Sequence, residues 1–296
     1  MYKIALLGTE NTHAREFAKI IHKGHSALGG IPYEDFEVVG ICGDRQDQNE
    51  LIREITGGKA EISDNPDAWV GKVDAIMVTA RHGDKHFKFA KKYIEAGTPA
   101  FIDKPITIKP DEAIELVRLA KKHNVPLCGG STLGFIDDVQ NMKSIVNSDT
   151  AQKIYGGSVS APCNLTSEHG GFFFYSQHLV QMMTEVFGHD IESVIAVNHD
   201  ETVTFIGRYP NFDVTGHYHG SPKYAITIHE HGRTHHRDVW FSEDSYITEF
   251  RRFEHMIRTG KMPDSYEHLI DPVFILNAIY ESYTTGKEVK IKRLEI

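Results

Sequence analysis

The sequence is poor in cysteine and has no long hydrophobic run. Its three cysteines, Cys42, Cys128 and Cys163, lie far apart and form no C-x-x-C pair. This spacing argues against a zinc ribbon and a disulfide framework, and it favours a reducing, cytoplasmic environment. No apolar stretch approaches the roughly 20 residues of a membrane span. The chain enters an apolar strand at once, so we expect neither a membrane partner nor a signal peptide.

Basic residues are also fewer than acidic ones. The 296 residues include 32 Lys and Arg against 41 Asp and Glu, which gives a formal net charge of −9. Such a chain has no overall attraction for polyanions, so we expect no nucleic-acid partner. Its length favours two domains or one large domain.

A third shortage concerns glycine in the first strand–turn–helix unit. Apolar residues 4–7 predict a buried strand that ends at Gly8, and a helix with one apolar face follows. A unit of this kind offers helix amides to an anion, and its dinucleotide-binding form carries G-x-G-x-x-G. Here Glu10 and His13 occupy the second and third glycine positions. The motif is therefore incomplete, and Glu10 adds negative charge where phosphates would lie.

A second apolar strand, residues 36–42, leads into Gly43-Asp44-Arg45. An acidic residue at the end of this strand accepts the ribose hydroxyls of NAD in many dinucleotide-binding domains. An aspartate in an ordinary turn is an equally good interpretation. Arg45 could instead meet the 2′-phosphate of NADP, so the choice between NAD and NADP stays open.

Strands and helices alternate as far as residue 128. We expect further strands at 74–78, 100–102 and 125–128, helices between them, and a short helix from Asn65-Pro66 to Trp69. This alternation predicts an α/β fold with a Rossmann-type, doubly wound parallel sheet over residues 1–128.

The pattern changes in the second half of the chain. Six runs rich in Val, Ile, Thr and Tyr between residues 154 and 241 predict a mostly antiparallel sheet. Helices are expected at 172–187, 246–258 and 271–284. Residues 129–296 should therefore form an α+β domain, with the last helix free to pack back on the first domain.

Lys104 stands at the end of the apolar run that begins at Ala100. Pro105 ends regular strand pairing because proline lacks an N–H and fixes its own φ. Lys104 is thereby placed at the carboxyl edge of the sheet, where ligands bind in open α/β folds. A desolvated lysine there can move protons near neutral pH. The alternative is a solvated loop lysine that pairs with Asp103.

Several stretches together resemble the Gfo/Idh/MocA family, the relatives of glucose–fructose oxidoreductase and inositol dehydrogenase. Asp103-Lys104-Pro105 is similar to the family's Glu-Lys-Pro. Residues 74–86 and 95–98 resemble its fourth strand and following helix. Residues 170–188, with His178, resemble its catalytic helix, and residues 278–287 its closing helix. The similarity covers nearly the whole chain.

The resemblance implies an NAD(P)-dependent oxidoreductase that interconverts a secondary hydroxyl and a ketone on a polyol, sugar or sugar derivative. It also implies a homodimer or homotetramer formed through the C-terminal sheet. Lys104 and His178 would be the catalytic residues that move the hydroxyl proton. The implied substrate contacts are Lys104, His169, Tyr175 and His178. The implied cofactor contacts are Gly8, Thr9, Glu10, Asn11, Asp44, Arg45, Thr79, Ala80, Arg81, His86, Asp103 and Lys104.

Two departures from the family pattern keep a second hypothesis open. Phe174 stands where the family has an aspartate four residues before the histidine, and Glu10 stands where it has a glycine. The chain could therefore be a non-catalytic or regulatory member that binds a small ligand.

The 18 histidines suggest a third hypothesis. Two pairs on expected strands, His217 with His219 and His229 with His231, each share one face of the sheet. With His235 and His236 they could form a three-histidine metal site for hydrolase or lyase chemistry. A polar sheet face is the favoured alternative, and we assign no metal. A last group is expected to line the cleft, where neutral imidazoles can bind hydroxyls: His13, His82, His86 and His169.

Overall fold

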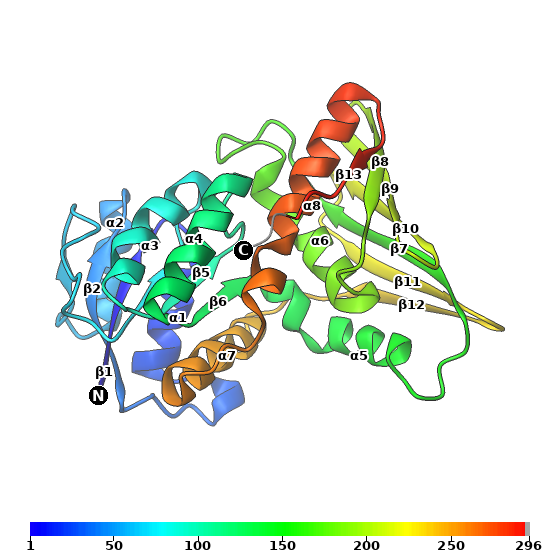
Figure 1. The fold of residues 1–296 in the computed structure, drawn as a ribbon. Coiled ribbons are helices and arrows are strands. Elements are labelled where there is room, and N and C mark those ends of the chain that lie inside the picture. The colour runs from blue at the N-terminus through cyan, green and yellow to red at the C-terminus, as the bar shows by residue number, and fades with distance from the viewer. Residues whose placement is uncertain (294–296) are drawn as a thin grey trace.

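The computed structural model describes residues 1–293, which form two sheets with helices packed on and between them (Figure 1). The N-terminal sheet is parallel throughout, with the strand order β3-β2-β1-β4-β5-β6. This confirms the predicted doubly wound sheet. Its strands are β1 (Tyr2–Leu7), β2 (Phe36–Cys42), β3 (Glu61–Ile62), β4 (Ala75–Val78), β5 (Ala100–Asp103) and β6 (Leu127–Gly130).

Helices cover both faces of this sheet because each has one apolar side. The core on one face takes its side chains from α1 (Thr12–Lys23) and α2 (Gln46–Ile55). The core on the other face takes them from α3 (His86–Glu95) and α4 (Pro110–His123). The carboxyl ends of β1, β4 and β5 are left open toward the second half of the molecule.

The second sheet has the order β12-β11-β7-β10-β9-β8-β13. All neighbours are antiparallel except β7 and β10, which confirms the mostly antiparallel prediction. Side chains of α5 (Asp137–Val146) and α6 (Phe173–Phe187) lie in the core on one face. The strands are β7 (Ile154–Pro162), β8 (Ser193–His199), β9 (Thr202–Arg208), β10 (Asp213–His219), β11 (Tyr224–Glu230), β12 (Arg233–Val239) and β13 (Val289–Lys290).

The C-terminal helices join the two halves. Helix α7 (Ser245–Thr259) buries Phe250 and Phe253 in the same core as α1, so it covers the N-terminal sheet. Helix α8 (Tyr266–Thr285) places Val273 in the core of the first sheet and Ile279 in the core of the second. It lies between the two sheets in Figure 1. The domain boundary at residue 128 stays a prediction.

Two local predictions were wrong, and one helix was missed. Residues 65–69 form turns rather than a helix, because the Asn65 side chain accepts the amide of Asp67 and so competes with helical pairing. The sixth strand lies two residues later than expected, since the Val125 amide still bonds to Ala120 at the end of α4. Helix α5 was not anticipated.

The last features concern the cysteines and the apolar character of the helices. All three cysteines are buried and free. None of the helices in the described part of the chain combines the length and apolar character needed to cross a membrane.

Candidate active site

A cavity of about 210 Å³ lies where the first sheet meets helix α6. Its wall comes from the start of α1, the carboxyl end of β5, helix α6, strand β11 and the start of α7. The lining residues are Glu10, Asn11, Thr12, His13, Arg81, Lys104, Thr132, Leu133, Phe174, Tyr175, His178, Tyr224, Phe241 and Tyr246.

A second cavity of about 280 Å³ shares Glu10 and Arg81 with the first. It extends along the edge of the sheet to Asp44 and Arg45 at the end of β2. The two cavities together make a groove that runs from a candidate ribose site to Lys104. This is the edge at which open α/β sheets bind their ligands.

Lys104 is buried at the end of β5 and faces the first cavity. Its backbone amide donates to Asp103 Oδ1 at 2.7 Å, which fixes the turn after the strand. Its Nζ lies 3.4 Å from the carbonyl oxygen of Phe174 and 4.7 Å from the centre of the Phe174 ring. Burial lowers the pKa of Lys104, and the nearby Arg81 adds to this while Asp103 opposes it. The amine can therefore give up a proton more readily than a surface lysine.

His178 projects from α6 into the same cavity. Its Nδ1 lies 2.7 Å from Ser131 Oγ, and no described residue bonds to its Nε2. Burial lowers the pKa of His178 well below 6.5, and the positive charge of Lys104 lowers it further. The imidazole is therefore neutral near pH 7, with one nitrogen oriented by Ser131 and the other directed to the cavity.

The ring of Phe174 contacts two cationic side chains of the site. Its ring lies 4.7 Å from Lys104 Nζ and 5.6 Å from the guanidinium carbon of Arg81. Both contacts are cation–π contacts, which hold a cation without neutralising it. The ring contacts therefore leave both side chains available to a ligand in the groove.

The turn between β1 and α1 passes very close to the backbone of Ala80. Gly8 has φ +84°, and a Cβ there would lie 2.3 Å from the Ala80 backbone. Thr79 Oγ1 donates to the Gly8 carbonyl at 2.7 Å. The side chain of Asn11, at the N-cap, donates to Asp103 Oδ2 instead of capping α1. The first amides of α1 therefore have no side-chain cap and can bind an anion.

The charge of Glu10 is offset by a residue distant in sequence. Lys85, between β4 and α3, lies 3.4 Å from Glu10 Oε1 and forms an ion pair with Asp44. Glu10 Oε2 is buried, and residues 1–293 offer it no hydrogen-bond partner. The objection to Glu10 as a cofactor neighbour is therefore weaker than the sequence suggested. With Lys85, Arg81 and the uncapped helix amides, the groove fits a pyrophosphate.

Most of the predicted site residues converge on this groove. Lys104, Tyr175 and His178 line the first cavity with Glu10, Asn11 and Arg81, whereas His169, Asp44 and Arg45 line the second. A further group lies buried behind the walls: Gly8, Thr9, Thr79, Ala80, His86 and Asp103.

Two of these buried residues have evident local roles. Thr9 Oγ1 bonds to Asn49, which in turn donates to the Gly43 carbonyl at 2.8 Å. His86 lies with its two ring nitrogens 2.6 and 2.7 Å from the carbonyl oxygens of Pro105 and Ala80. Both thereby fix loops at the carboxyl edge of the sheet.

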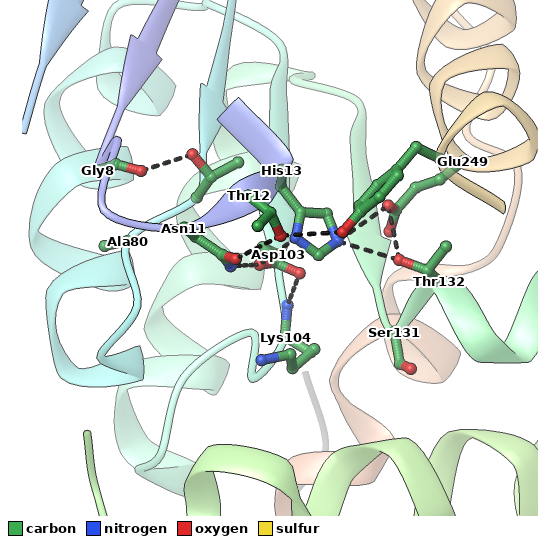
Figure 2. Close-up of polar contacts among 12 residues, drawn as sticks. Gly8, Asn11, Thr12, His13, Ala80, Asp103, Lys104, Ser131, Thr132 and Glu249 are labelled. Atoms are coloured by element: carbon green, nitrogen blue, oxygen red, sulfur yellow. Dashed lines mark hydrogen bonds and ion pairs between the residues drawn. The ribbon is translucent and has the colours of Figure 1, made fainter. Parts of the chain in front are cut away.

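His13 lines the first cavity and forms a polar cluster with Asp103, Thr132 and Glu249 (Figure 2). Its Nδ1 lies 3.4 Å from Asp103 Oδ2, and its Nε2 lies 3.4 Å from Glu249 Oε2 and 3.1 Å from Thr132 Oγ1. His13, Asp103 and Glu249 also meet the distance requirement for a metal site. His82 lines the second cavity and pairs with Asp84 at 2.8 Å.

Sequence reasoning missed several residues of the site. Ser131 directly follows the two glycines that end β6, and that position at the carboxyl edge could have indicated it. Glu249 stands on the apolar face of α7 that carries Tyr246, Phe250 and Phe253, and a charge on such a face is a usable signal. Tyr224 and Phe241 carried no such signal.

The histidine-rich strands do not form the hypothetical metal site. His217 and His219 lie on β10, His229 lies on β11, and β7 separates these two strands. His235 pairs with Glu230. Within residues 1–293, the His13 cluster is the one group whose ligand atoms lie close enough together for a metal.

Comparisons with known proteins agree with this geometry. Residues 2–130 match the Gfo/Idh/MocA family model, described as an oxidoreductase family with an NAD-binding Rossmann fold. D-glucoside 3-dehydrogenase of Escherichia coli K12 is 26% identical over 122 residues, 41% of this chain. The match spans 34% of that protein, about a third of its length.

Solved structures share the fold of the whole chain. Myo-inositol 2-dehydrogenase from Lactobacillus plantarum is 17% identical, with a TM-score of 0.83 over 98% of this chain and 99% of the other. Scyllo-inositol dehydrogenase from Lactobacillus casei, solved with NAD(H) and scyllo-inositol, is 14% identical, with a TM-score of 0.81 over 98% and 99% of the two chains. Residues 2–130 thus match the NAD-binding Rossmann domain of the Gfo/Idh/MocA oxidoreductase family, and the chain as a whole shares the fold of these solved structures.

Proposed function

We propose that this protein is an NAD-dependent dehydrogenase or reductase that interconverts a secondary hydroxyl and a ketone on a polyol, sugar or sugar derivative. The observation that carries the proposal is the meeting of Lys104 and His178 in one cavity. Lys104 follows strand β5 and His178 lies on helix α6, 74 positions later in the chain, yet both face the space next to the cofactor groove. Names of the matched dehydrogenases support a polyhydroxylated substrate.

The two side chains divide the proton chemistry. In the oxidation direction, His178 Nε2 accepts the proton of the substrate hydroxyl, because the imidazole is neutral and Ser131 fixes its other nitrogen. Lys104 donates a hydrogen bond to the same oxygen and stabilises its developing negative charge. In the reduction direction, the two residues return the proton to the ketone oxygen.

The cofactor supplies hydride acceptance and donation, and this chain supplies its binding and orientation. The uncapped amides of α1 and the side chain of Arg81 would hold the pyrophosphate, and Asp44 would accept the ribose hydroxyls. Arg45 is already paired with Asp47, through contacts of 3.1 and 2.5 Å. A free guanidinium for the 2′-phosphate of NADP is therefore missing at this position, which favours NAD.

Fluorescence titration tests the cofactor part of the proposal. NADH should bind with a Kd in the micromolar range and NADPH at least tenfold more weakly. Incubation of the enzyme and NAD with a panel of inositols, hexoses and glucosides should then produce NADH absorbance for at least one. Absence of binding of either cofactor at millimolar concentration would refute the proposal in favour of the non-catalytic alternative.

We also propose that the protein is a homodimer or homotetramer through the C-terminal sheet. Helices cover one face of that sheet, whereas Thr204, Thr215 and His217 lie half-buried on the other. Light scattering at micromolar concentration should give two or four times the chain mass of 33.4 kDa. A monomeric mass would refute it.

A further inference from the structure

Two buried carboxylates lie beside Lys104 without pairing with its ammonium. Asp103 is fully buried and Glu249 is 1% exposed. The described residues place neither carboxylate within ion-pair distance of Lys104 Nζ, whose nearest polar contact is the Phe174 carbonyl oxygen. Buried carboxylates need a positive partner to offset their lost hydration. The structure must therefore provide one other than Lys104.

His13 is in the position of that partner. One ring nitrogen faces Asp103 and the other faces Glu249, and Figure 2 shows Lys104 Nζ outside this set of contacts. The Thr132 hydroxyl donates to Glu249 Oε2 at 2.8 Å, so its oxygen is left to accept from His13 Nε2. That nitrogen must then carry a proton.

The other nitrogen decides the charge. In a neutral ring, Nδ1 would turn its lone pair toward Asp103 Oδ2 at 3.4 Å, and two acceptors would face each other in a buried site. A protonated Nδ1 instead places positive charge 3.4 Å from the carboxylate, as an ion pair, although the described residues give this nitrogen no hydrogen bond. The imidazolium also balances the cluster, since two carboxylates then meet one imidazolium and the ammonium of Lys104.

A divalent cation is the alternative occupant, because the ligand atoms lie within 4.8 Å of one another. Asp103 Oδ2 accepts from Asn11 at 2.7 Å and Oδ1 accepts the Lys104 amide, so a cation would compete with these bonds. The two carboxylates would neutralise a divalent ion, and the ammonium of Lys104 would then remain as an excess positive charge beside it. The charge balance therefore favours a proton over a metal.

We propose that His13 is a positioning residue, an imidazolium that neutralises Asp103 and Glu249 and so leaves the ammonium of Lys104 directed at the substrate oxygen. The proposal rests on the function proposed above for Lys104. The groups that face His13 are Asp103 and Lys104 from β5, Thr132 after β6, His178 from α6, and Tyr246 and Glu249 from α7. Burial alone would lower the pKa of His13, but Asp103 and Glu249 outweigh it, and the pKa is raised.

Nitrogen-15 NMR of the full chain tests the imidazolium directly. We expect both ring nitrogens of His13, assigned by their loss in His13→Gln, to be protonated at pH 8 and unchanged by EDTA. A neutral ring at pH 8, with the proton on Glu249 instead, would overturn the proposal. So would a ring nitrogen whose signal changes on EDTA treatment, which would indicate a bound metal. This readout needs no substrate, so it stands whether or not the dehydrogenase proposal holds.

Kinetics of His13→Gln test the positioning role, with the exposed His255→Gln on α7 as the control. Without the imidazolium, Asp103 should attract Lys104 and raise its pKa. We expect kcat at pH 7 to fall at least tenfold, the alkaline limb of the kcat profile to move up by one pH unit or more, and NADH affinity to change less than threefold. An unchanged pH profile would refute the role. A protein that binds no NADH and turns over no substrate would instead refute the proposed function.

Discussion

Substitution of Gly8 by alanine should destabilise the protein more than an ordinary glycine substitution. Gly8 has φ +84°, and an added Cβ would lie 2.3 Å from the Cα and N of Ala80. The backbone conformation costs a residue with a Cβ about 1–2 kcal/mol. Forcing the two loops apart adds about 1–3 kcal/mol, the usual range for overpacking. The expected loss of unfolding free energy is therefore roughly 2–5 kcal/mol.

Gly57 offers a matched control for the backbone contribution. It follows α2 with φ +73°, and its Cβ would meet no atom within 4 Å. Gly57→Ala should therefore lose only about 1–2 kcal/mol. The difference between the two variants, about 1–3 kcal/mol, isolates the contact between Gly8 and Ala80.

Urea unfolding followed by circular dichroism measures both variants. The midpoint should fall more for Gly8→Ala than for Gly57→Ala, with similar slopes. NADH affinity should fall only in Gly8→Ala, because the turn next to the α1 amides is displaced. Equal midpoints for the two variants would show that β1 and β4 are not as close at this turn as the structure has them, and would refute the reasoning.

Three further predictions concern the reaction. His178→Asn should lower kcat by about 10²- to 10⁴-fold, the usual contribution of a general base. The Kd for NADH should stay within threefold. If kcat and NADH affinity fall by the same factor, His178 is a structural residue. Asp44→Ala should weaken NADH binding about tenfold or more, since a hydrogen bond to a charged group contributes about 1.5–3 kcal/mol. Fluorescence titration measures the NADH affinity of the variant. An unchanged affinity would show that the ribose binds elsewhere. Because burial lowers the pKa of His178 from 6.5, the imidazole stays able to accept a proton just below that pH, and the acid limb of hydroxyl oxidation should lie below pH 6.5. Burial likewise lowers the pKa of Lys104 from 10.5, so the alkaline limb should lie below pH 10.5, and a pH–rate profile with limbs at the ordinary values would contradict both assignments.

The sequence alone determined the architecture of the first half and the place of Lys104. Residues 14, 17, 18 and 21 have helical spacing, and all four are buried in α1 as expected. The run from Ala100 ends at Pro105 because proline cannot continue the strand. These features depend on local periodicity and backbone chemistry, which a single sequence displays.

Only the tertiary structure decided which side chains share the site. Glu249 reaches His13 because α7 returns to the first sheet after more than 100 residues of the second domain, and no local pattern encodes that return. Lys85 offsets Glu10 for the same reason, since a loop after β4 lies beside the turn after β1. The histidine-rich strands show the converse. Their spacing suggested a metal site, but the sheet order places β7 between β10 and β11 and keeps the imidazoles apart. Contacts of this kind depend on how distant segments pack, which the spacing of residues along the chain does not specify.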